Sequence, residues 1–180
     1  LLREQIGGIA VREIAQRFGT PTFVYDASII TQRVADLRMF DTVRYAQKAC
    51  SNLSILNLIR RRGAMVDAVR ASEIRRALEA GYSLDGDLPP IIYTATIFDR
   101  EAWDRCVEKN IHVNCGSSNM IRQLGERAPG REITLRINPG FGHGHSQKTN
   151  TGGPQSKHGI WHEQLGECLA LAAEQGLTVT

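Results

Sequence analysis

Hydrophobic residues recur along the chain with two alternating periods, which predict helices and strands in turn. Apolar positions spaced three and four apart predict a helix over 11–18, which Gly19 and Pro21 end. The same spacing predicts further helices over 28–38, 53–62, 71–80, 99–109, 117–126 and 161–172. Short apolar runs predict strands at 22–25, 42–46, 65–69, 91–93, 111–114 and 132–138, with another beginning at 177–180.

Regular alternation of strand and helix is typical of parallel sheets with helical crossovers. No G-x-G-x-x-G sequence follows the first strand of the alternation, so the dinucleotide-binding fold is disfavoured. We therefore predict an α/β protein of the (β/α)8 TIM-barrel type. That barrel needs about 250 residues, so about five to six of its strands are expected here and the barrel is expected to be incomplete. The strand at 22–25 precedes the barrel and is expected to belong elsewhere.

Composition and charge exclude several classes of protein. The 180 residues are 42% hydrophobic and 23% charged, which is globular rather than disordered. No apolar run approaches the length of a membrane span, and the first residues do not resemble a secretory signal. The net charge of +3 is too small, and its basic residues too dispersed, to indicate nucleic-acid binding. Four scattered cysteines favour free thiols in a cytoplasmic protein.

Polar residues at the predicted strand ends are the candidates for function, because barrel enzymes place their sites there. These residues are Lys48, Asp67, Asn114 and Arg136. Arg136 alternates with apolar neighbours, so its side chain is expected inside the barrel, where it needs an anionic partner. Asp67 and Glu73 are the candidates for that partner, and a purely structural ion pair is the alternative.

Lys48 lies just beyond the strand at 42–46, on the same face as Ala46. The small alanine leaves room beside the lysine stem. A lysine amine that is held near another cation, or is partly removed from water, becomes a nucleophile for carbonyl groups. The alternative interpretation is an ordinary surface lysine.

The segment 138–159 is a long loop rich in glycine, of a kind that often serves as a functional lid. It lacks the Gly-Lys-Ser/Thr of a phosphate-binding P-loop. His143 and His145 could chelate a metal, but no carboxylate or cysteine lies near them in the sequence. We therefore predict no metal site.

Three segments together resemble the fold-type III (alanine racemase-like) pyridoxal-phosphate-dependent decarboxylases. Residues 45–50, Y-A-Q-K-A-C, are similar to their Y-A-x-K-A-N motif. Residues 66–74, V-D-A-V-R-A-S-E-I, resemble their V-D-x-x-S-x-G-E-L/I segment. Residues 135–140, followed by 151–153 and 156–159, are similar to the R-I-N-P, T-G and S-K-F-G stretch of diaminopimelate decarboxylases. The motifs occur in the family's order and spacing.

The resemblance implies roles for particular residues. Lys48 matches the catalytic lysine that binds the aldehyde of pyridoxal 5'-phosphate. Asp67 and Glu73 match acidic residues beside it, and Arg136 matches an arginine that also belongs to the cofactor site. The predicted cofactor-binding residues are therefore Lys48, Asp67 and Arg136.

The resemblance also implies a domain organisation and an assembly. Residues 1–27 would contribute to a separate β domain, and residues 28–180 would form the first part of the pyridoxal-phosphate barrel. The family's phosphate loop, substrate arginines and catalytic cysteine would lie beyond residue 180. A homodimer is implied, with active sites at the subunit interface. A chain ending at residue 180 would be expected to show no turnover.

The implied reaction is decarboxylation of meso-2,6-diaminopimelate to L-lysine and carbon dioxide. Two alternatives remain open: a related decarboxylase for another basic amino acid, and an inactive relative that binds the cofactor as a regulatory or carrier protein. A barrel of another family that handles sugars or phosphates is a third, weaker interpretation.

The chain departs from the family pattern at four positions. Arg70 replaces serine, Ser72 replaces glycine, Cys50 replaces asparagine and His158 replaces phenylalanine. Arg70 is expected to bring bulk and charge near the site.

Overall fold

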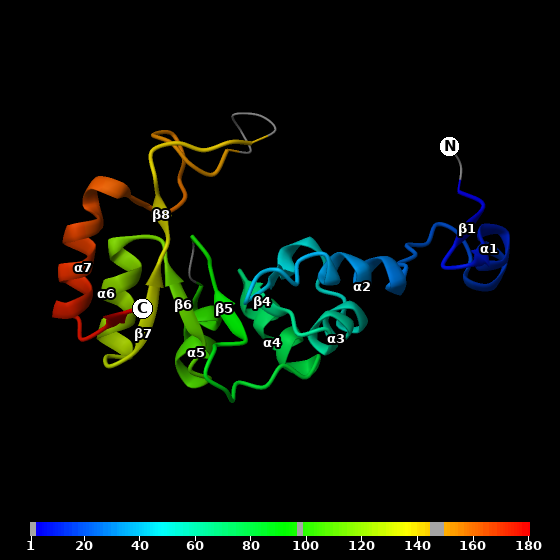
Figure 1. Cartoon of the computed structure of the whole chain (residues 1–180). Coiled ribbons are helices and arrows are strands. Elements are labelled where there is room, and N and C mark those ends of the chain that lie inside the picture. The colour runs from blue at the N-terminus through cyan, green and yellow to red at the C-terminus, as the bar shows by residue number, and fades with distance from the viewer. Residues whose placement is uncertain (1–2, 97–98, 145–149) are drawn as a thin grey trace.

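A parallel sheet forms the centre of the molecule. The computed structural model describes residues 3–96, 99–144 and 150–180 (Figure 1). Six parallel strands pair in the order β10-β7-β6-β5-β4-β3. They are β3 (Arg44–Ala46), β4 (Met65–Ala68), β5 (Ile91–Tyr93), β6 (His112–Cys115), β7 (Glu132–Leu135) and β10 (Thr178–Val179). From β3 to β7, strands that follow one another in the sequence are neighbours in the sheet, as in a (β/α)8 barrel. The two edge strands, β3 and β10, do not pair with each other, so the described residues form no closed barrel.

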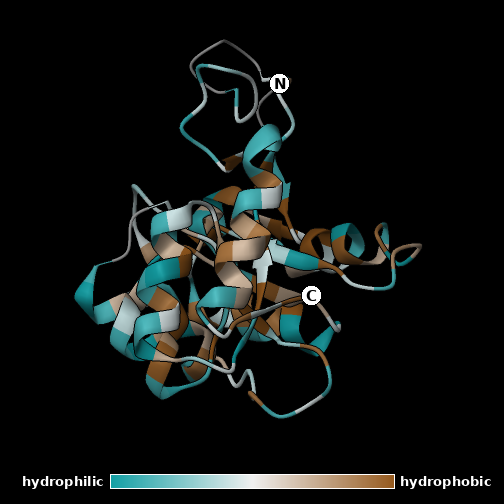
Figure 2. Cartoon of the chain, turned by 90° about the vertical axis from the view of Figure 1, so that its left-hand side faces the viewer, coloured by the Kyte–Doolittle hydropathy of each residue, from teal (hydrophilic) through white to brown (hydrophobic). Residues whose placement is uncertain are grey.

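Helices lie between the strands, and four of the six start at a residue whose side chain caps the first turn. They are α2 (Ala27–Ala35), α3 (Leu53–Arg61), α4 (Ala71–Glu79), α5 (Arg100–Glu108), α6 (Ser118–Arg127) and α7 (Leu165–Glu174). Side chains of Asp26, Asn52, Asp99 and Ser117 accept hydrogen bonds from the first backbone amides of α2, α3, α5 and α6. Each helix carries hydrophobic and hydrophilic residues together, as expected for helices with one buried side (Figure 2).

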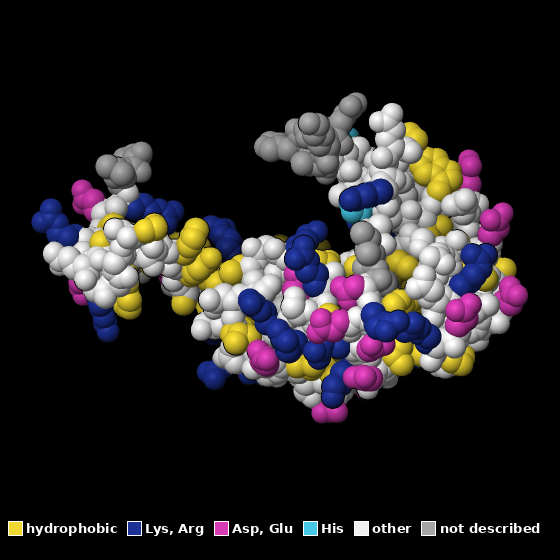
Figure 3. Space-filling view, turned by 180° about the vertical axis from the view of Figure 1, so that it is seen from behind, with side chains coloured by type: hydrophobic (Ala, Val, Ile, Leu, Met, Phe, Trp, Pro, Cys, Tyr) yellow, Lys and Arg dark blue, Asp and Glu magenta, His cyan; other side chains and the backbone are white. Residues whose placement is uncertain are grey.

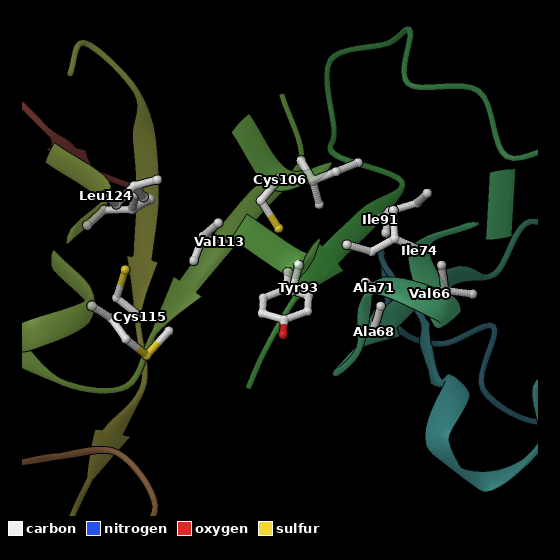
Figure 4. Close-up of a cluster of buried hydrophobic side chains, with 14 of the residues drawn as sticks. Val66, Ala68, Ala71, Ile74, Ile91, Tyr93, Cys106, Val113, Cys115 and Leu124 are labelled. Carbon is white, nitrogen blue, oxygen red and sulfur yellow. The ribbon is translucent and has the colours of Figure 1, made fainter. Parts of the chain in front are cut away.

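The hydrophobic core lies between the sheet and these helices. Alternate strand residues point into it, among them Val66, Ile91, Tyr93 and Val113, each at most 1% exposed (Figure 4). Period-two alternation then sends Asp67 and its equivalents on neighbouring strands to the opposite side. We call that opposite side the inner face, because it would line the interior of a closed barrel.

The N-terminal elements lie apart from the sheet (Figure 1). They are β1 (Gln5–Ile6), β2 (Ile9–Ala10) and α1 (Val11–Phe18), and the two short strands form an antiparallel pair. The strand predicted at 22–25 is wrong, since these residues have no regular secondary structure. A strand needs a hydrogen-bonding partner, and the described chain supplies none here; Phe23 is 92% exposed.

The strand predicted over 132–138 is divided in two. Arg136 lies between β7 and β8 (Ile137–Asn138), and β8 pairs with β9 (Ile160–Trp161) rather than with the six-stranded sheet. The helix predicted from residue 161 therefore starts later, because Trp161 belongs to β9. A 3₁₀ turn, η3 (His162–Gln164), leads into α7.

Surface charge is mixed rather than gathered. Basic and acidic side chains alternate over the face shown in Figure 3. Within the described ranges, no helix has the length and apolar character that crossing a bilayer requires. His145, a candidate metal ligand from the sequence, lies outside the described residues.

Candidate active site on the inner face of the sheet

Lys48 lies at the carboxyl end of β3, in the 3₁₀ turn η1 (Gln47–Ala49). The turn is anchored by Gln47, whose buried side-chain amide donates to the carbonyl of Glu73 at 2.7 Å. The hydroxyl of Tyr45 donates to the carbonyl of Cys50 at 3.1 Å and holds the other side of the turn. Lys48 itself is exposed. A rigid turn thus presents a free amine at the end of the sheet where barrel enzymes have their sites.

Asp67 is the acidic residue that shares this region with Lys48. It lies on β4 in register with Ala46 of β3, and its side chain is half-buried. Burial raises the pKa of the Asp67 carboxyl above its usual value. The nearby Thr94 hydroxyl and the positive charges of Lys48, Arg136 and Arg44 act in the opposite direction. The three cations therefore all lie close enough to act on this carboxylate.

One oxygen of the Asp67 carboxylate is buried without a hydrogen-bond partner among the described residues. That atom is Oδ1. A buried carboxylate oxygen without a donor is costly, so an unsatisfied one is typical of a site that receives a ligand or a further part of the protein.

Arg136 follows β7 and is fixed through its backbone. Its amide donates to the carbonyl of Cys115 at 2.8 Å, and its carbonyl accepts from the amide of Ile160 at 2.8 Å. Its half-buried guanidinium influences both Asp67 and His158. Among the described residues it forms no ion pair within 4.0 Å, so the site holds it near Asp67 without a direct salt bridge.

Glu73, the other candidate partner of Arg136, has a different task. Its carboxylate Oε2 accepts a hydrogen bond from the Val69 amide at 2.8 Å, and its side chain is almost fully buried. This bond stabilises the turn from β4 into α4, because the carboxylate satisfies an amide at the start of the helix. Among the described residues Glu73 forms no ion pair with Arg136, so this candidate pairing is not observed.

The loop at 138–159 is tied down at both ends. The buried side chain of Asn138 donates to the Gly153 carbonyl and accepts from the Gly153 amide, both at 2.9 Å. Gly159 then lies against the backbone of β8 with a φ of 82°. Its neighbour His158 is thereby brought to the site, where its Nδ1 lies 3.4 Å from the Thr96 hydroxyl. Burial, followed by the charges of Arg136, Lys157 and Lys48, lowers the pKa of His158.

Two residues of the inner face were given no function from the sequence: Thr94 was not a candidate, and Asn114 was a candidate without a role. Thr94 follows β5, and Asn114 lies on β6, with the amide of Asn114 3.5 Å from the Thr94 hydroxyl. Extending the alternation of residues 91–93 by one position would have placed Thr94 on the inner face. His158 was noted only as a departure from the family pattern.

Two expectations about the site concern metals and Arg70. Within the described ranges, no group of three metal-ligating side chains comes together. Arg70 is exposed just before α4, and in the part of the chain that the structure describes its side chain forms no hydrogen bond or ion pair. The structure therefore does not bring the charge of Arg70 into contact with Lys48 or Asp67.

Comparison with known proteins decides the family. The family described as "Pyridoxal-dependent decarboxylase, pyridoxal binding domain" matches residues 27–180. The chain belongs to this family. The predicted family and its cofactor, pyridoxal phosphate, are thus confirmed.

Relatives with high sequence identity carry one name. The chain is 54% identical over 172 residues to a diaminopimelate decarboxylase of Streptomyces coelicolor, covering 96% of this chain and 39% of the relative. It is 53% identical over 152 residues to the Escherichia coli K12 enzyme of that name, covering 84% of this chain and 36% of the relative. The chain therefore spans less than two fifths of the length of these curated relatives.

Solved structures confirm the predicted fold class. A crystal structure of diaminopimelate decarboxylase superposes with a TM-score of 0.91 at 47% identity, covering 97% of this chain and 42% of that one. A mutant enzyme of Helicobacter pylori complexed with L-lysine gives 0.84 at 26% identity, covering 94% and 45%. The open six-stranded sheet thus matches part of a pyridoxal-dependent decarboxylase barrel.

The inner face fits the cofactor of this family. Pyridoxal phosphate needs an amine that its aldehyde can bind and polar groups beside its ring and phosphate. The inner face supplies a free amine on Lys48, a carboxylate oxygen of Asp67 that lacks a donor, and the guanidinium of Arg136.

Proposed function

We propose that the whole protein decarboxylates meso-2,6-diaminopimelate to L-lysine and carbon dioxide with pyridoxal phosphate. One observation carries this proposal: at the carboxyl end of a sheet of the pyridoxal-dependent decarboxylase family, Lys48 and Arg136 lie close enough for their charges to act on the carboxylate of Asp67. The choice of substrate is supported by the name that the relatives share. It is also supported by a structure of the Helicobacter pylori diaminopimelate decarboxylase, 26% identical to this chain, that was solved as a complex with L-lysine.

In this proposal each residue of the chain has a separate task. Lys48 would hold the cofactor through its amine. Asp67 stabilises positive charge at the Lys48 nitrogen through its carboxylate, and Arg136 keeps Asp67 ionised. Bound pyridoxal phosphate supplies a sink for the electron pair that the departing carboxylate leaves behind.

The charge of the inner face also favours the ligands of this reaction. Lys48, Arg136 and Arg44 act together on the single carboxylate of Asp67, so positive charge exceeds negative charge around it. A local excess of positive charge attracts anions and increases their local concentration. Pyridoxal phosphate and a dicarboxylate substrate are both anionic, so the electrostatics are consistent with the proposal.

Reductive labelling tests the attachment of the cofactor. Borohydride treatment of the full-length protein loaded with pyridoxal phosphate should fix the cofactor mass on the peptide that contains Lys48. Lys109, which follows α5, serves as the internal control and should remain unlabelled. Label on another lysine, with none on Lys48, would refute the proposed site.

Domain division, assembly and compartment belong to the same proposal. We propose a β-domain contribution from residues 1–27 and a barrel portion from 28–180; the separate position of β1, β2 and α1 supports this division (Figure 1). We also propose a cytoplasmic homodimer. Sedimentation equilibrium of the full-length protein should give twice the mass of one chain, and a single-chain mass at micromolar concentration would contradict the dimer.

A further inference from the structure

Gln47, the residue immediately before Lys48, is completely buried although its side chain is polar. Its amide nitrogen Nε2 donates to the backbone carbonyl of Glu73 at 2.7 Å, between residues 26 positions apart in the chain. Glu73 lies in the first turn of α4, whereas Gln47 begins η1 at the end of β3. This side chain therefore ties the turn that carries Lys48 to a different element of the fold.

Glu73 is bound in turn to the backbone that follows Asp67. Its carboxylate Oε2 accepts from the Val69 amide at 2.8 Å, and Val69 comes just after the end of β4. Glu73 thus receives the turn of Lys48 through its carbonyl and holds the end of β4 through its carboxylate. Two short hydrogen bonds connect the backbone that carries the amine with the backbone that carries the Asp67 carboxylate.

The pairing of β3 with β4 does not fix Lys48 by itself. The ladder reaches Ala46, opposite Asp67, and Lys48 lies beyond it in the 3₁₀ turn. Within η1, in the part of the chain that the structure describes, Gln47 has the side chain that bonds to α4. An exposed bond from Arg76 to the Ser51 carbonyl, at 3.1 Å, holds only the residues after the turn.

The second polar atom of the Gln47 amide shows that packing alone does not account for this residue. Oε1 is buried, and among the described residues no group donates a hydrogen bond to it. A buried oxygen without a donor lowers stability, so an apolar side chain of the same length would serve packing better. Methionine has that length, and Gln47→Met therefore removes the tie while it keeps the shape.

We propose that Gln47 is a positioning residue, which acts through Glu73 to hold the amine of Lys48 at a fixed place relative to Asp67. The inference rests on the proposed function for the identity of the cofactor that the amine receives. The two hydrogen bonds that carry it depend on no ligand, and Gln47 touches neither cofactor nor substrate. A displacement of reacting groups by about 1 Å can slow a reaction about a hundredfold, so the tie matters for reactivity.

The first experiment measures how fast pyridoxal phosphate attaches to Lys48 in the cofactor-free, full-length protein, from the growth of its absorption band. Attachment should be about tenfold slower in Gln47→Met than in the parent protein. Acetic anhydride, a small reagent, should acetylate the exposed Lys48 equally fast in both proteins. Equal acetylation and similar melting temperatures would show that position has changed, rather than exposure or folding.

Gln123→Met is the matched control. Oε1 of Gln123 accepts from the indole Nε1 of Trp103 at 2.9 Å, so this variant also removes a partly buried hydrogen bond, here between α6 and α5. It should attach the cofactor at the parental rate. Attachment at the parental rate in Gln47→Met, or an equal loss in Gln123→Met, would overturn the inference.

Gln47→Glu tests rescue by the conservative variant. A protonated carboxyl can donate to the Glu73 carbonyl and an ionised one cannot, and burial raises the pKa of such a carboxyl. The attachment rate, divided by the parental rate at the same pH, should therefore be near one in acid and fall to the Gln47→Met value as the pH rises. A ratio that does not change with pH would contradict the role given to the donated hydrogen bond.

A measurement without cofactor separates this inference from the proposed function. The positive charge of Lys48 lowers the pKa of Asp67, so Lys48→Met should raise the titration midpoint of Asp67, followed through its ¹³C carboxyl resonance. Arg44 and Arg136 act on the same carboxylate and stay unchanged. The rise should be smaller when Gln47→Met is also present, because the tie that keeps the two groups together is then lost.

An equal rise with and without Gln47→Met would refute the inference even if the protein proves to be a decarboxylase. Absence of any cofactor on Lys48 in the parent protein would instead refute the proposed function, and the titration would still decide whether Gln47 positions the amine.

Discussion

Replacement of Lys48 by alanine should reduce decarboxylation by at least about a thousandfold, because the amine forms the bond that holds the cofactor in the reactive orientation. The turn that carries Lys48 is fixed by Gln47 and Tyr45, neither of which depends on the lysine side chain. Lys48 is also exposed, so its loss should leave folding almost unaffected. Carbon dioxide release and thermal unfolding of the variant measure the two effects separately.

Lys109→Ala provides the matched control, because it removes an equal side chain at the end of α5. It should retain both activity and the yellow colour of the bound cofactor. A Lys48→Ala protein that keeps its cofactor after dialysis and releases carbon dioxide at the parental rate would contradict the assignment of Lys48. Loss of activity in both variants would also contradict it, since the effect would not be specific to this amine.

The sequence predicted the central helices and strands well where the hydrophobic periodicity and the capping residues indicated the same element. The strand at 91–93 was predicted with its observed bounds, and the helix over 99–109 differs from α5 by one residue at each end. Both have strong local signals: a β-branched run in the first, and an aspartate cap before an amphipathic stretch in the second. The positions of Lys48 and Asp67 at strand ends followed from the same signals.

The failures have tertiary causes. The strand predicted at 22–25 had the right composition but no partner among the described residues, and composition does not show whether a partner exists. The break at Arg136 depends on β9, which comes more than twenty residues later in the chain, so local periodicity could not show it. Glu73 matched an acidic motif position, yet its carboxylate satisfies the Val69 amide, a use that depends on the local turn geometry.

Thr94 illustrates a third limit of the sequence. A threonine after a strand has many ordinary roles, and its meeting with Asn114 on the inner face arises only because β5 pairs with β6. Parallel pairing joins residues about 20 positions apart, and their register fixes which side chains meet. The chemistry of the site was therefore easier to predict than the residues that support it.

Replacement of Gly159 by alanine should weaken cofactor binding by about tenfold or more, because this glycine fixes the returning end of the 138–159 loop. Its φ of 82° is unfavourable for alanine, at a cost of about 1–2 kcal/mol. An added Cβ would also lie 2.9 Å from the backbone nitrogen of Asn138 and 3.0 Å from the carbonyl oxygen of Arg136. The backbone that carries Arg136 and His158 would have to move. Titration with pyridoxal phosphate measures the loss.

Gly130→Ala separates the two costs, since Gly130 also has a φ of 82° but an added Cβ would meet nothing within 4 Å. It should carry only the conformational cost and leave cofactor affinity unchanged. The difference in cofactor affinity between the two variants then measures the effect of the close contact between Gly159 and the backbone of Arg136 and β8. Equal affinities in the two variants would show that the backbone beside Arg136 tolerates the extra carbon, and that this contact does not hold the site together.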